Sequence, residues 1–551
     1  MTRFHRRPSA RLSPVLREAL NYCLLFCVVG CRTTDAYMSP APGPTVLYVS
    51  TTGADSNDGR KERPLRTLEH ALRQANVREI VLAPGTHRAQ EVKIQRKGLS
   101  LRGESATLIG NLSIEADDAR VDSIAIRGAI RVRDAARVRL DRIVAGPSQS
   151  SSRSRPRGEH AVENAPENTL ENTLDIEASG VELTRSILNC GTRACLKAKT
   201  STLTLTSVNL NAQPKTLRGL RIADSIASLR DVTLEKTTTA QVVAERGTHI
   251  SIRDAHFASA EGSGIVAVGG STIKITRTDV LSAARSALVF QDANARVDHV
   301  HVSAKSGPTI GIAGGETLLA HAEIESTPVG AVSIIRHKDQ GKVRIVDGKV
   351  THLRNPGVTI ASGDVTIRGT VFVGDATATS DGGEGVLAQG LDTRVNIDAV
   401  FDAPTSFGVS INQDASGTVS ATVTNPRLGA VMVDAATTER VHIKYLKAEN
   451  CREGSGVVVL DSSAVTISRA EISGCSEAGV LAGTGSDVTI AASTLLGNRE
   501  YGVAAFGGSR ISLDGTTIQG SRWATFSTCI DGARVDQGSA NHILGATMDC
   551  P

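Results

Sequence analysis

The sequence has few aromatic residues, and its charges cancel once the first residues are set apart. Phe, Trp and Tyr make up 3% of the 551 residues, and Trp523 is the single tryptophan. The formal net charge is +4, but residues 1–30 hold five arginines and one glutamate, so the chain from Cys31 onward is neutral. A neutral chain lacks the basic surface by which proteins bind nucleic acids or anionic membranes. We therefore expect no nucleic-acid partner.

Short enzyme motifs are missing as well. The chain has no Gly-x-Ser-x-Gly elbow, no His-Glu-x-x-His, no phosphate-binding loop and no Gly-x-Gly-x-x-Gly fingerprint. Helical periodicity is absent from the repeats described below, where Val, Ile, Thr, Ser and Gly favour short strands and turns. These absences argue against the common hydrolase, metalloprotease and nucleotide-binding classes.

The first residues have the features of an export signal. Arginines precede an apolar run over residues 19–30, which is too short to span a bilayer as a stable anchor. The run ends in VVGC, which resembles a bacterial lipobox and implies that residues 1–30 are removed and Cys31 is lipidated. The alternative is an ordinary signal peptide with an incidental cysteine. Because Arg32 rather than Asp follows, analogy with Gram-negative sorting predicts an outer-membrane lipoprotein with a flexible tether at 31–45.

Six of the nine cysteines form local pairs. Cys23 and Cys27 lie in the predicted export signal, and Cys31 is the expected lipidation site. An even set in an exported chain predicts disulfides rather than metal ligation, because no pair has the Cys-x-x-Cys spacing. The expected pairs are Cys190 with Cys195, Cys451 with Cys475, and Cys529 with Cys550.

A repeat of 23 residues is the strongest pattern in the chain. Segments such as GVLAGTGSDVTIAASTLLGNREY begin at Gly456, Gly479 and Gly502, and each holds two stretches of alternating apolar and polar residues. Such alternation is typical of strands with one buried face. Strands that return at this interval without crossover helices must coil into a solenoid in which each turn pairs with the next. The pattern resembles the right-handed parallel β-helix of pectin-lyase-like proteins, which implies an all-β, single-stranded, right-handed parallel β-helix solenoid.

The ends of a solenoid need caps. The segment LYVSTTGADSNDGRKERPLRTLEHALRQA (47–75) resembles the opening of many bacterial β-helix proteins, the DUF1565-type domain of unknown function. Within it, Thr67 is placed to cap a short helix, whose apolar stripe consists of Leu68, Ala71, Leu72 and Ala75. At the other end, Trp523 and Phe526 offer apolar cover.

One stretch interrupts the repeats. Residues 147–172 are polar and rich in Pro and Ser, which predicts a low-complexity loop insertion. The boundaries that follow are an N-terminal cap with the first coils at 46–110, further coils at 111–146 and 173–524, and a C-terminal cap at 525–551.

The outward residues of the first strand of each coil show whether the repeat carries catalytic groups. In many enzymes of the fold that the repeat resembles, carboxylates, lysines or arginines project there. If the residue after the opening glycine points inward, two outward columns result, which include Val266, Gln389, Val431 and Val433. These columns hold one charge and no carboxylate, so they predict neither an acid–base pair nor a calcium cage.

A polar cluster stands out in the middle of the chain. Aligned repeats place four residues in one outward column, namely His256, Asp279, His301 and Glu323. His299 and His321 fall in the column two residues earlier. Imidazoles and carboxylates on neighbouring coils suit a transition metal or a proton-transfer pair. The favoured alternative is a solvated face on which opposite charges alternate.

A second candidate site lies near the N-terminal cap. Asp55, Asn57 and Asp58 offer oxygen atoms that suit calcium. Asx residues and glycines are also what a tight turn before a capping helix requires, and this alternative is favoured. Calcium and a transition metal are the only cofactors that the sequence suggests.

Two hypotheses follow for function. The first is a non-catalytic cell-envelope lipoprotein, a β-helix rod that serves as a binding or structural scaffold for a polysaccharide or an envelope protein. It would contact the membrane through its lipid anchor only. The absence of enzyme motifs, the nearly uncharged outward columns and the neutral net charge favour this first hypothesis. The second is a polysaccharide-active enzyme, a lyase or glycoside hydrolase of the pectin-lyase-like fold, with its site on loops or at the histidine cluster.

Overall fold

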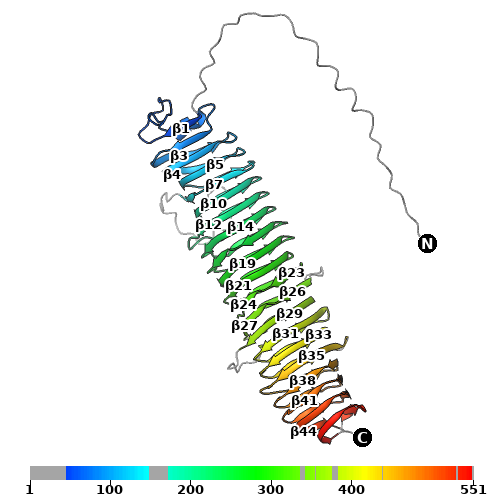
Figure 1. Ribbon diagram of the computed structural model, residues 1–551. Coiled ribbons are helices and arrows are strands. Elements are labelled where there is room, and N and C mark those ends of the chain that lie inside the picture. Colours follow the sequence, from blue (N-terminus) through cyan, green and yellow to red (C-terminus); the bar gives the residue numbers. More distant parts are fainter. Residues whose placement is uncertain are drawn as a thin grey trace, which may run out of the picture. The chain divides into compact units, whose positions relative to one another are not determined.

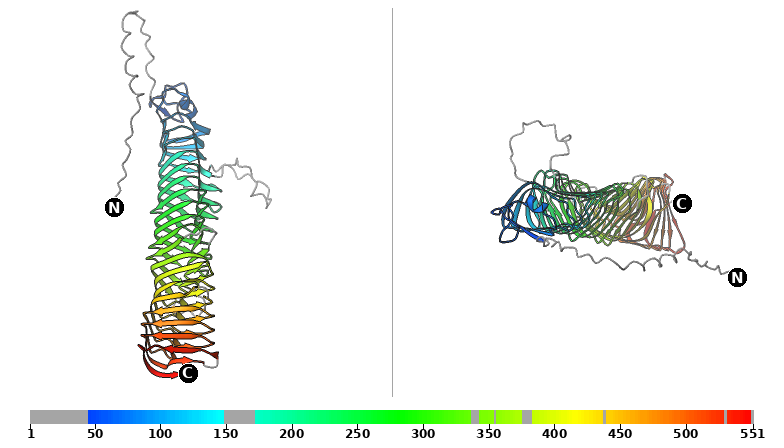
Figure 2. Two further views of the ribbon diagram at one scale, coloured as in Figure 1. Left: turned by 90° about the vertical axis from the view of Figure 1, so that its right-hand side faces the viewer. Right: turned by 90° about the horizontal axis from the view of Figure 1, so that it is seen from above.

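The strands of the chain stack turn upon turn. The computed structural model describes residues 45–147, 172–335, 342–353, 355–374, 383–436, 439–528 and 531–548. The strands pair in parallel with those one turn earlier and one turn later. Figures 1 and 2 show the turns stacked in sequence order from β1 towards β44. The described chain is therefore a parallel β-helix, and the predicted solenoid is confirmed.

Three faces, which we name A, B and C, make up each turn. Face A holds β6 (Ile130–Arg133), β9 (Asn172–Glu177), β11 (Ala194–Lys199), β13 (Arg218–Ala223), β15 (Ala240–Glu245), β18 (Ser263–Val268), β20 (Leu288–Gln291), β22 (Ile310–Ala313), β25 (Val332–Ile335), β28 (Val358–Ile360), β30 (Val386–Gln389), β32 (Phe407–Asn412), β34 (Gly429–Asp434), β36 (Val457–Leu460), β39 (Ala478–Ala482) and β42 (Tyr501–Ala505). Face B holds β1 (Val46–Val49), β2 (Glu79–Leu82), β7 (Val138–Asp141), β16 (His249–Arg253), β23 (Thr317–Ala320), β26 (Lys342–Val346), β37 (Ala464–Ser468), β40 (Asp487–Ala491), β43 (Arg510–Asp514) and β45 (Arg534–Gln537). Face C holds β8 (Val144–Gly146), β17 (His256–Ala258), β24 (Glu323–Glu325), β27 (Lys349–Leu353), β38 (Ala470–Ser473) and β41 (Thr494–Leu496).

Longer strands cover more than one face. Those that bend from face B to face C are β5 (Arg120–Arg127), β10 (Gly180–Asn189), β12 (Thr202–Asn211), β14 (Ile226–Glu235), β19 (Thr272–Ala283), β21 (Asn294–Ala304), β29 (Gly363–Gly374), β31 (Thr393–Asp402), β33 (Ser416–Thr424) and β35 (Val441–Glu449). Those that continue from face C to face A are β3 (Gly85–Ile94), β4 (Ser100–Ile114, which starts on face B), β44 (Thr517–Ser527) and β46 (His542–Met548).

Alternating side chains build the interior. In β31 every second residue from Thr393 to Phe401 is buried, and the residues between them are exposed. The inward residues of all turns join in one apolar cluster that extends from Leu47 to Val535. Each inward side chain therefore packs mainly against its own turn and the two adjacent turns, as in other repeat proteins.

The glycine that opens each repeat occupies a place too narrow for a side chain. A Cβ on Gly264, in β18, would lie 2.3 Å from Cγ1 of Val280 on face C of the same turn. It would also lie 2.5 Å from the carbonyl oxygen of Ala287 in the next turn. Gly456 shows the same constraint, with Ile472 and the carbonyl oxygen of Gly479. Close approach of faces A and C thus explains why glycine recurs at this position.

The N-terminal cap contains α1 (Leu68–Arg73), the short helix that the sequence predicts. Thr67 Oγ1 accepts a hydrogen bond from the backbone N–H of His70 at 3.3 Å, and Leu68 and Ala71 are buried. Ala75 was expected in the apolar stripe but is exposed, because the helix ends before Gln74, which is already extended. Among the described residues, no helix has the length and hydropathy needed to span a bilayer.

Disulfides join two of the predicted pairs. Cys190 bonds to Cys195, and Cys451 bonds to Cys475. The second bond links neighbouring turns, because β35 and β38 pair just before the two cysteines. The remaining pair, Cys529 with Cys550, lies outside the described residues, as do the export signal, Cys31 and most of the predicted insertion.

Candidate functional site

The predicted histidine cluster lies at the corner between faces B and C. Arg277 and His299 occupy this corner in β19 and β21, and His321 and Asp347 occupy it in the next two turns. Their φ angles lie between 46° and 50°, a left-handed conformation that is uncommon for residues other than glycine. All four side chains are exposed. The corner thus presents four polar side chains to solvent, one above another.

Two histidines share one carboxylate at this corner. Oδ1 of Asp298, the last residue of face B in β21, lies 2.8 Å from Nδ1 of His299 and 2.9 Å from Nδ1 of His321. The two imidazole rings are stacked, with centroids 4.4 Å apart and planes inclined by 23°. The hydrogen bond from His321 lowers the pKa of Asp298, desolvation works against it, and the hydrogen bond from His299 adds to it. Asp298 is therefore an acceptor for both rings.

The other predicted column runs up face C. His256, Asp279, His301 and Glu323 are paired in register on β17, β19, β21 and β24, where the aligned repeats place them. Nδ1 of His256 lies 3.5 Å from Oδ2 of Asp279, while Nε2 of His301 lies 3.3 Å from Oε1 of Glu325 rather than beside Glu323. Among the described residues, Asp298, His299 and His321 are the one group of three whose ligating atoms all lie within 4.8 Å of one another.

The residues considered for calcium organise the loop before α1. Asp55 accepts hydrogen bonds from the backbone N–H groups of Arg66 and Thr67 and from the Thr67 hydroxyl. Burial acts to raise the pKa of Asp55, but these hydrogen bonds lower it on balance. Asn57 donates to the carbonyl of Pro64, and Asp58 accepts from the N–H of Arg60. These contacts within the protein support the turn rather than the ion site.

Face A differs from the prediction in the turn that contains β34. Gly429 pairs with Phe407, which displaces the strand by one residue from the expected register. Asp434 therefore points outward, whereas Val431 and Val433 are buried. Outward carboxylates also occur on β9 and β15, namely Asp175, Glu177 and Glu245. The prediction that these columns lack carboxylates is therefore wrong.

Asp434 belongs to a group of polar atoms that sequence reasoning missed. Burial raises the pKa of Asp434, and the neighbouring Asp461 carboxyl raises it further. Oδ1 of Asp434, Oδ1 of Asn412 and Oγ of Ser410 are buried and have no hydrogen-bond partner. Asn412 and Asp434 are paired in register on β32 and β34. Unsatisfied buried polar atoms reduce stability and are more typical of functional surfaces than of packing.

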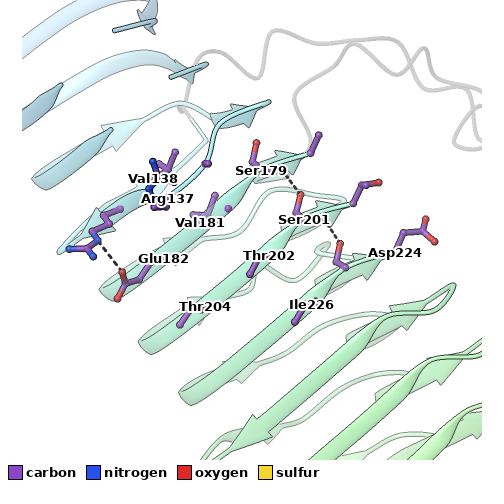
Figure 3. Close-up of a pocket in the computed structure, with 16 residues that line it drawn as sticks. Arg137, Val138, Ser179, Val181, Glu182, Ser201, Thr202, Thr204, Asp224 and Ile226 are labelled. Atoms are coloured by element: carbon purple, nitrogen blue, oxygen red, sulfur yellow. Dashed lines mark hydrogen bonds and ion pairs between the residues drawn. The ribbon is translucent and has the colours of Figure 1, made fainter. Parts of the chain in front are cut away.

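A shallow hollow on face B also has polar side chains in its lining. Its lining comes from the starts of β7, β10, β12 and β14 (Figure 3). Ser201 Oγ accepts from the N–H of Ser179 and donates to a carbonyl, and Ser225 Oγ repeats this pattern one turn later. Because these hydroxyls satisfy the backbone, they are structural groups rather than nucleophiles.

Residues 429–548 match a family model described as right handed beta helix region. The right-handed winding implied by the resemblance to pectin-lyase-like proteins is therefore confirmed. No curated protein sequence matches the chain.

Solved β-helix structures resemble the chain weakly. The Dettilon tailspike protein gp208 is 9% identical, with a TM-score of 0.33 over 60% of this chain and 67% of that chain. The alginate lyase AlyGC of family PL6 is 10% identical, with a TM-score of 0.28 over 91% of this chain and 100% of that chain. The pectate lyase Pel9A is 9% identical, with a TM-score of 0.31 over 59% and 78%. At these values the likeness concerns the fold alone.

The raised pKa of Asp434 predicts a measurable effect on stability. A carboxyl whose pKa is raised on folding stabilises the protein only while it is protonated, and this contribution is lost as pH rises through the folded-state pKa. Asp434→Asn removes the charge, so we expect its thermal midpoint to exceed that of wild type by a few degrees at about pH 7. The difference should vanish at about pH 3, where the aspartate is neutral in both states. Differential scanning calorimetry at both pH values tests this, with the exposed Asp402→Asn as control.

Proposed function

We propose that this protein is a non-catalytic, lipid-anchored scaffold of the cell envelope that binds a neutral polysaccharide along face A. The observation that carries the proposal is the chemistry of seven consecutive turns, from β18 to β32. Their outward side chains that reach the surface of face A are uncharged, namely Val266, Val268, Val289, Gln291, Gly311, Ala313, Ser333, Ile335, Thr359, Leu387, Gln389 and Asn412. We call this surface the neutral strip.

The neutral strip suits an extended, uncharged ligand. Amides such as Gln291 and Gln389 exchange hydrogen bonds with hydroxyl groups, and the aliphatic side chains between them contact non-polar ligand surface. A polyanion would find no counter-charge there, which disfavours an acidic polymer. Towards the C-terminal end of the same face, four partly exposed aromatic rings contact one another, and such rings offer apolar faces to a sugar. They are Tyr501, Phe506, Trp523 and Phe526.

The predicted export signal, the lipobox resemblance at Cys31 and the disulfides support a location in the cell envelope. Disulfides such as Cys451–Cys475 persist in oxidising compartments outside the cytoplasm. A lipid on Cys31 would tether the solenoid to the outer membrane and leave its faces accessible to envelope polymers.

A second candidate function is a polysaccharide-active enzyme, and one observation favours it. Asp434 and Asp461 form a carboxyl pair on face A, and a carboxyl with a raised pKa is the kind of group that acts as a general acid. The partly exposed Asn412 is paired in register with Asp434 and lies beside it.

One experiment separates the two functions. The mature protein is mixed with a neutral glucan and with polygalacturonate, and both binding and the release of new chain ends are measured. We expect binding of the glucan without cleavage. Val289→Glu places a charge in the neutral strip and should weaken binding at least about tenfold, equivalent to ~1.4 kcal/mol.

The matched control is Ile226→Glu, which changes an exposed aliphatic residue on face B and should leave binding unaltered. Equal loss in both variants, or no binding to neutral glucans, would contradict the scaffold proposal. Cleavage that disappears in Asp434→Asn would establish the enzyme instead.

A further inference from the structure

The corner between faces B and C carries histidines at two successive turns, His299 and His321. In some other turns an arginine at the corner forms an ion pair with an aspartate one turn below, as Arg142 does with Asp122 and Arg277 with Asp254. At the next two corners histidines replace arginine, and both use the single carboxylate of Asp298. An arginine cannot give up its proton to become a ligand, but a neutral imidazole offers a lone pair. The substitution therefore changes an ion-pair corner into a donor cluster.

We propose that Asp298, His299 and His321 bind a divalent transition-metal ion through Oδ1 and the two Nδ1 atoms. Two imidazole nitrogens and one carboxylate oxygen are a donor set for Zn²⁺, Cu²⁺ or Ni²⁺, whereas Ca²⁺ and Mg²⁺ prefer oxygen ligands alone. The inference is independent of the ligand proposed for the neutral strip.

The separations between the donor atoms are close to those that a bound ion requires. Ligands at about 2.0–2.1 Å from a tetrahedral ion stand roughly 3.3 Å from one another. In the structure Oδ1 of Asp298 lies 2.8 Å and 2.9 Å from the two nitrogens, with protons between them. Replacing these protons with an ion requires each nitrogen to move away from Oδ1 by only a few tenths of an ångström, and the two nitrogens lie within 4.8 Å of each other. The paired backbone of β21 and β23 holds them in place during that change.

Binding through Nδ1 moves the proton of each neutral imidazole to Nε2, and a carboxylate lies near one of these nitrogens, just beyond hydrogen-bond distance. Asp347 occupies the corner between faces B and C one turn after His321, and its Oδ2 lies 4.0 Å from Nε2 of His321. A carboxylate in this position orients the ring and increases its basicity, as outer carboxylates do in other histidine–metal sites. Below the cluster, Arg277 is held by Asp254 at 2.7 Å, so its positive charge is compensated. Asp347 is therefore a positioning residue for the site.

The cluster is open to solvent on one side. The side chains of His299 and His321 are 59% and 48% exposed, and Asp298 is 29% exposed. An ion can therefore enter without any rearrangement of the solenoid, and water can complete its coordination. Three protein ligands with an open position are the arrangement of accessible rather than purely structural metal sites.

Isothermal titration of the chelator-treated, untagged protein with ZnCl₂ tests the proposal. We expect one Zn²⁺ per chain, and a loss of affinity of at least about tenfold in His299→Ala, His321→Ala and Asp298→Asn. Asp347→Asn should weaken binding by a smaller factor. With Co²⁺ as the probe, wild type should show the visible absorption of a nitrogen- and oxygen-ligated ion, and His321→Ala should not.

The matched controls are His256→Ala and His301→Ala, which remove histidines of face C that lie outside the cluster and should bind Zn²⁺ as wild type does. All six histidine and aspartate positions that are changed are at least partly exposed, and circular dichroism verifies that each variant keeps its strands. Absence of Zn²⁺ binding, or equal losses in the control and cluster variants, would overturn the proposal.

Discussion

Phe401→Ala is expected to destabilise the solenoid by about 3–5 kcal/mol, the range for removal of a fully buried phenylalanine. Phe401 has no exposed surface, and its ring is stacked on that of Phe372 one turn below, with centroids 4.8 Å apart. The truncation removes this contact and leaves a cavity lined by two turns that are pinned by backbone pairing between β29 and β31. Because the paired backbones cannot collapse into the space, the loss should approach the upper end of the range.

Val400→Ala is the control for this prediction. Val400 precedes Phe401 in β31 but points outward and is 42% exposed, so we expect a change within about 0.5 kcal/mol. Urea unfolding followed by circular dichroism gives the free energies of the transition. Hydrogen exchange should show lost protection concentrated in β29, β31 and β33, since turns of a solenoid depend mainly on their neighbours. Equal destabilisation by the two substitutions would contradict the assignment of Phe401 to the core.

The architecture was predictable because its signal is repeated. Opening glycines such as Gly456 and Gly479, and the alternation that follows each of them, indicate paired strands with one buried face, and the register of β36, β39 and β42 agrees with that spacing. Errors in single repeats do not alter such a conclusion. The capping helix was found for a local reason, because Thr67 and the apolar residues after it lie within one turn of each other.

Positions that depend on a single turn were harder to predict. The slip at Gly429 arises from the length of one loop, and it moves Asp434 from the predicted interior to the surface. The role of Asp298 was missed for another reason. It stands one residue before the corner, and the left-handed backbone at His299 brings its carboxylate beside the stacked rings of two successive turns. Likewise His301 reaches Glu325 instead of the register-paired Glu323, a choice made by side-chain geometry rather than by spacing.

Gly264→Val is expected to disrupt the pairing between β18 and β20 on face A. A valine needs space that Val280 of face C and the carbonyl oxygen of Ala287 already occupy, with predicted separations of 2.3 Å and 2.5 Å from its Cβ. The side chain of Val280 can shift, but the carbonyl belongs to the pairing between β18 and β20, so relief requires that pairing to open. Overpacking alone costs about 1–3 kcal/mol, and broken backbone pairs add to it.

Gly311→Val provides the matched control, because Gly311 also lies on face A, in β22, but points outward. No heavy atom lies within 4 Å of a Cβ built on it, and its φ is not positive, so valine should be tolerated. We expect soluble, cooperatively unfolding protein from Gly311→Val, and from Gly264→Val a protein that proteases cleave near β18 and β20 under native conditions. If both variants resist proteolysis equally, the narrow contact between faces A and C is not what selects glycine. Glycine would then recur because tight backbone turns between the strands need its conformational freedom, and not because of its small size.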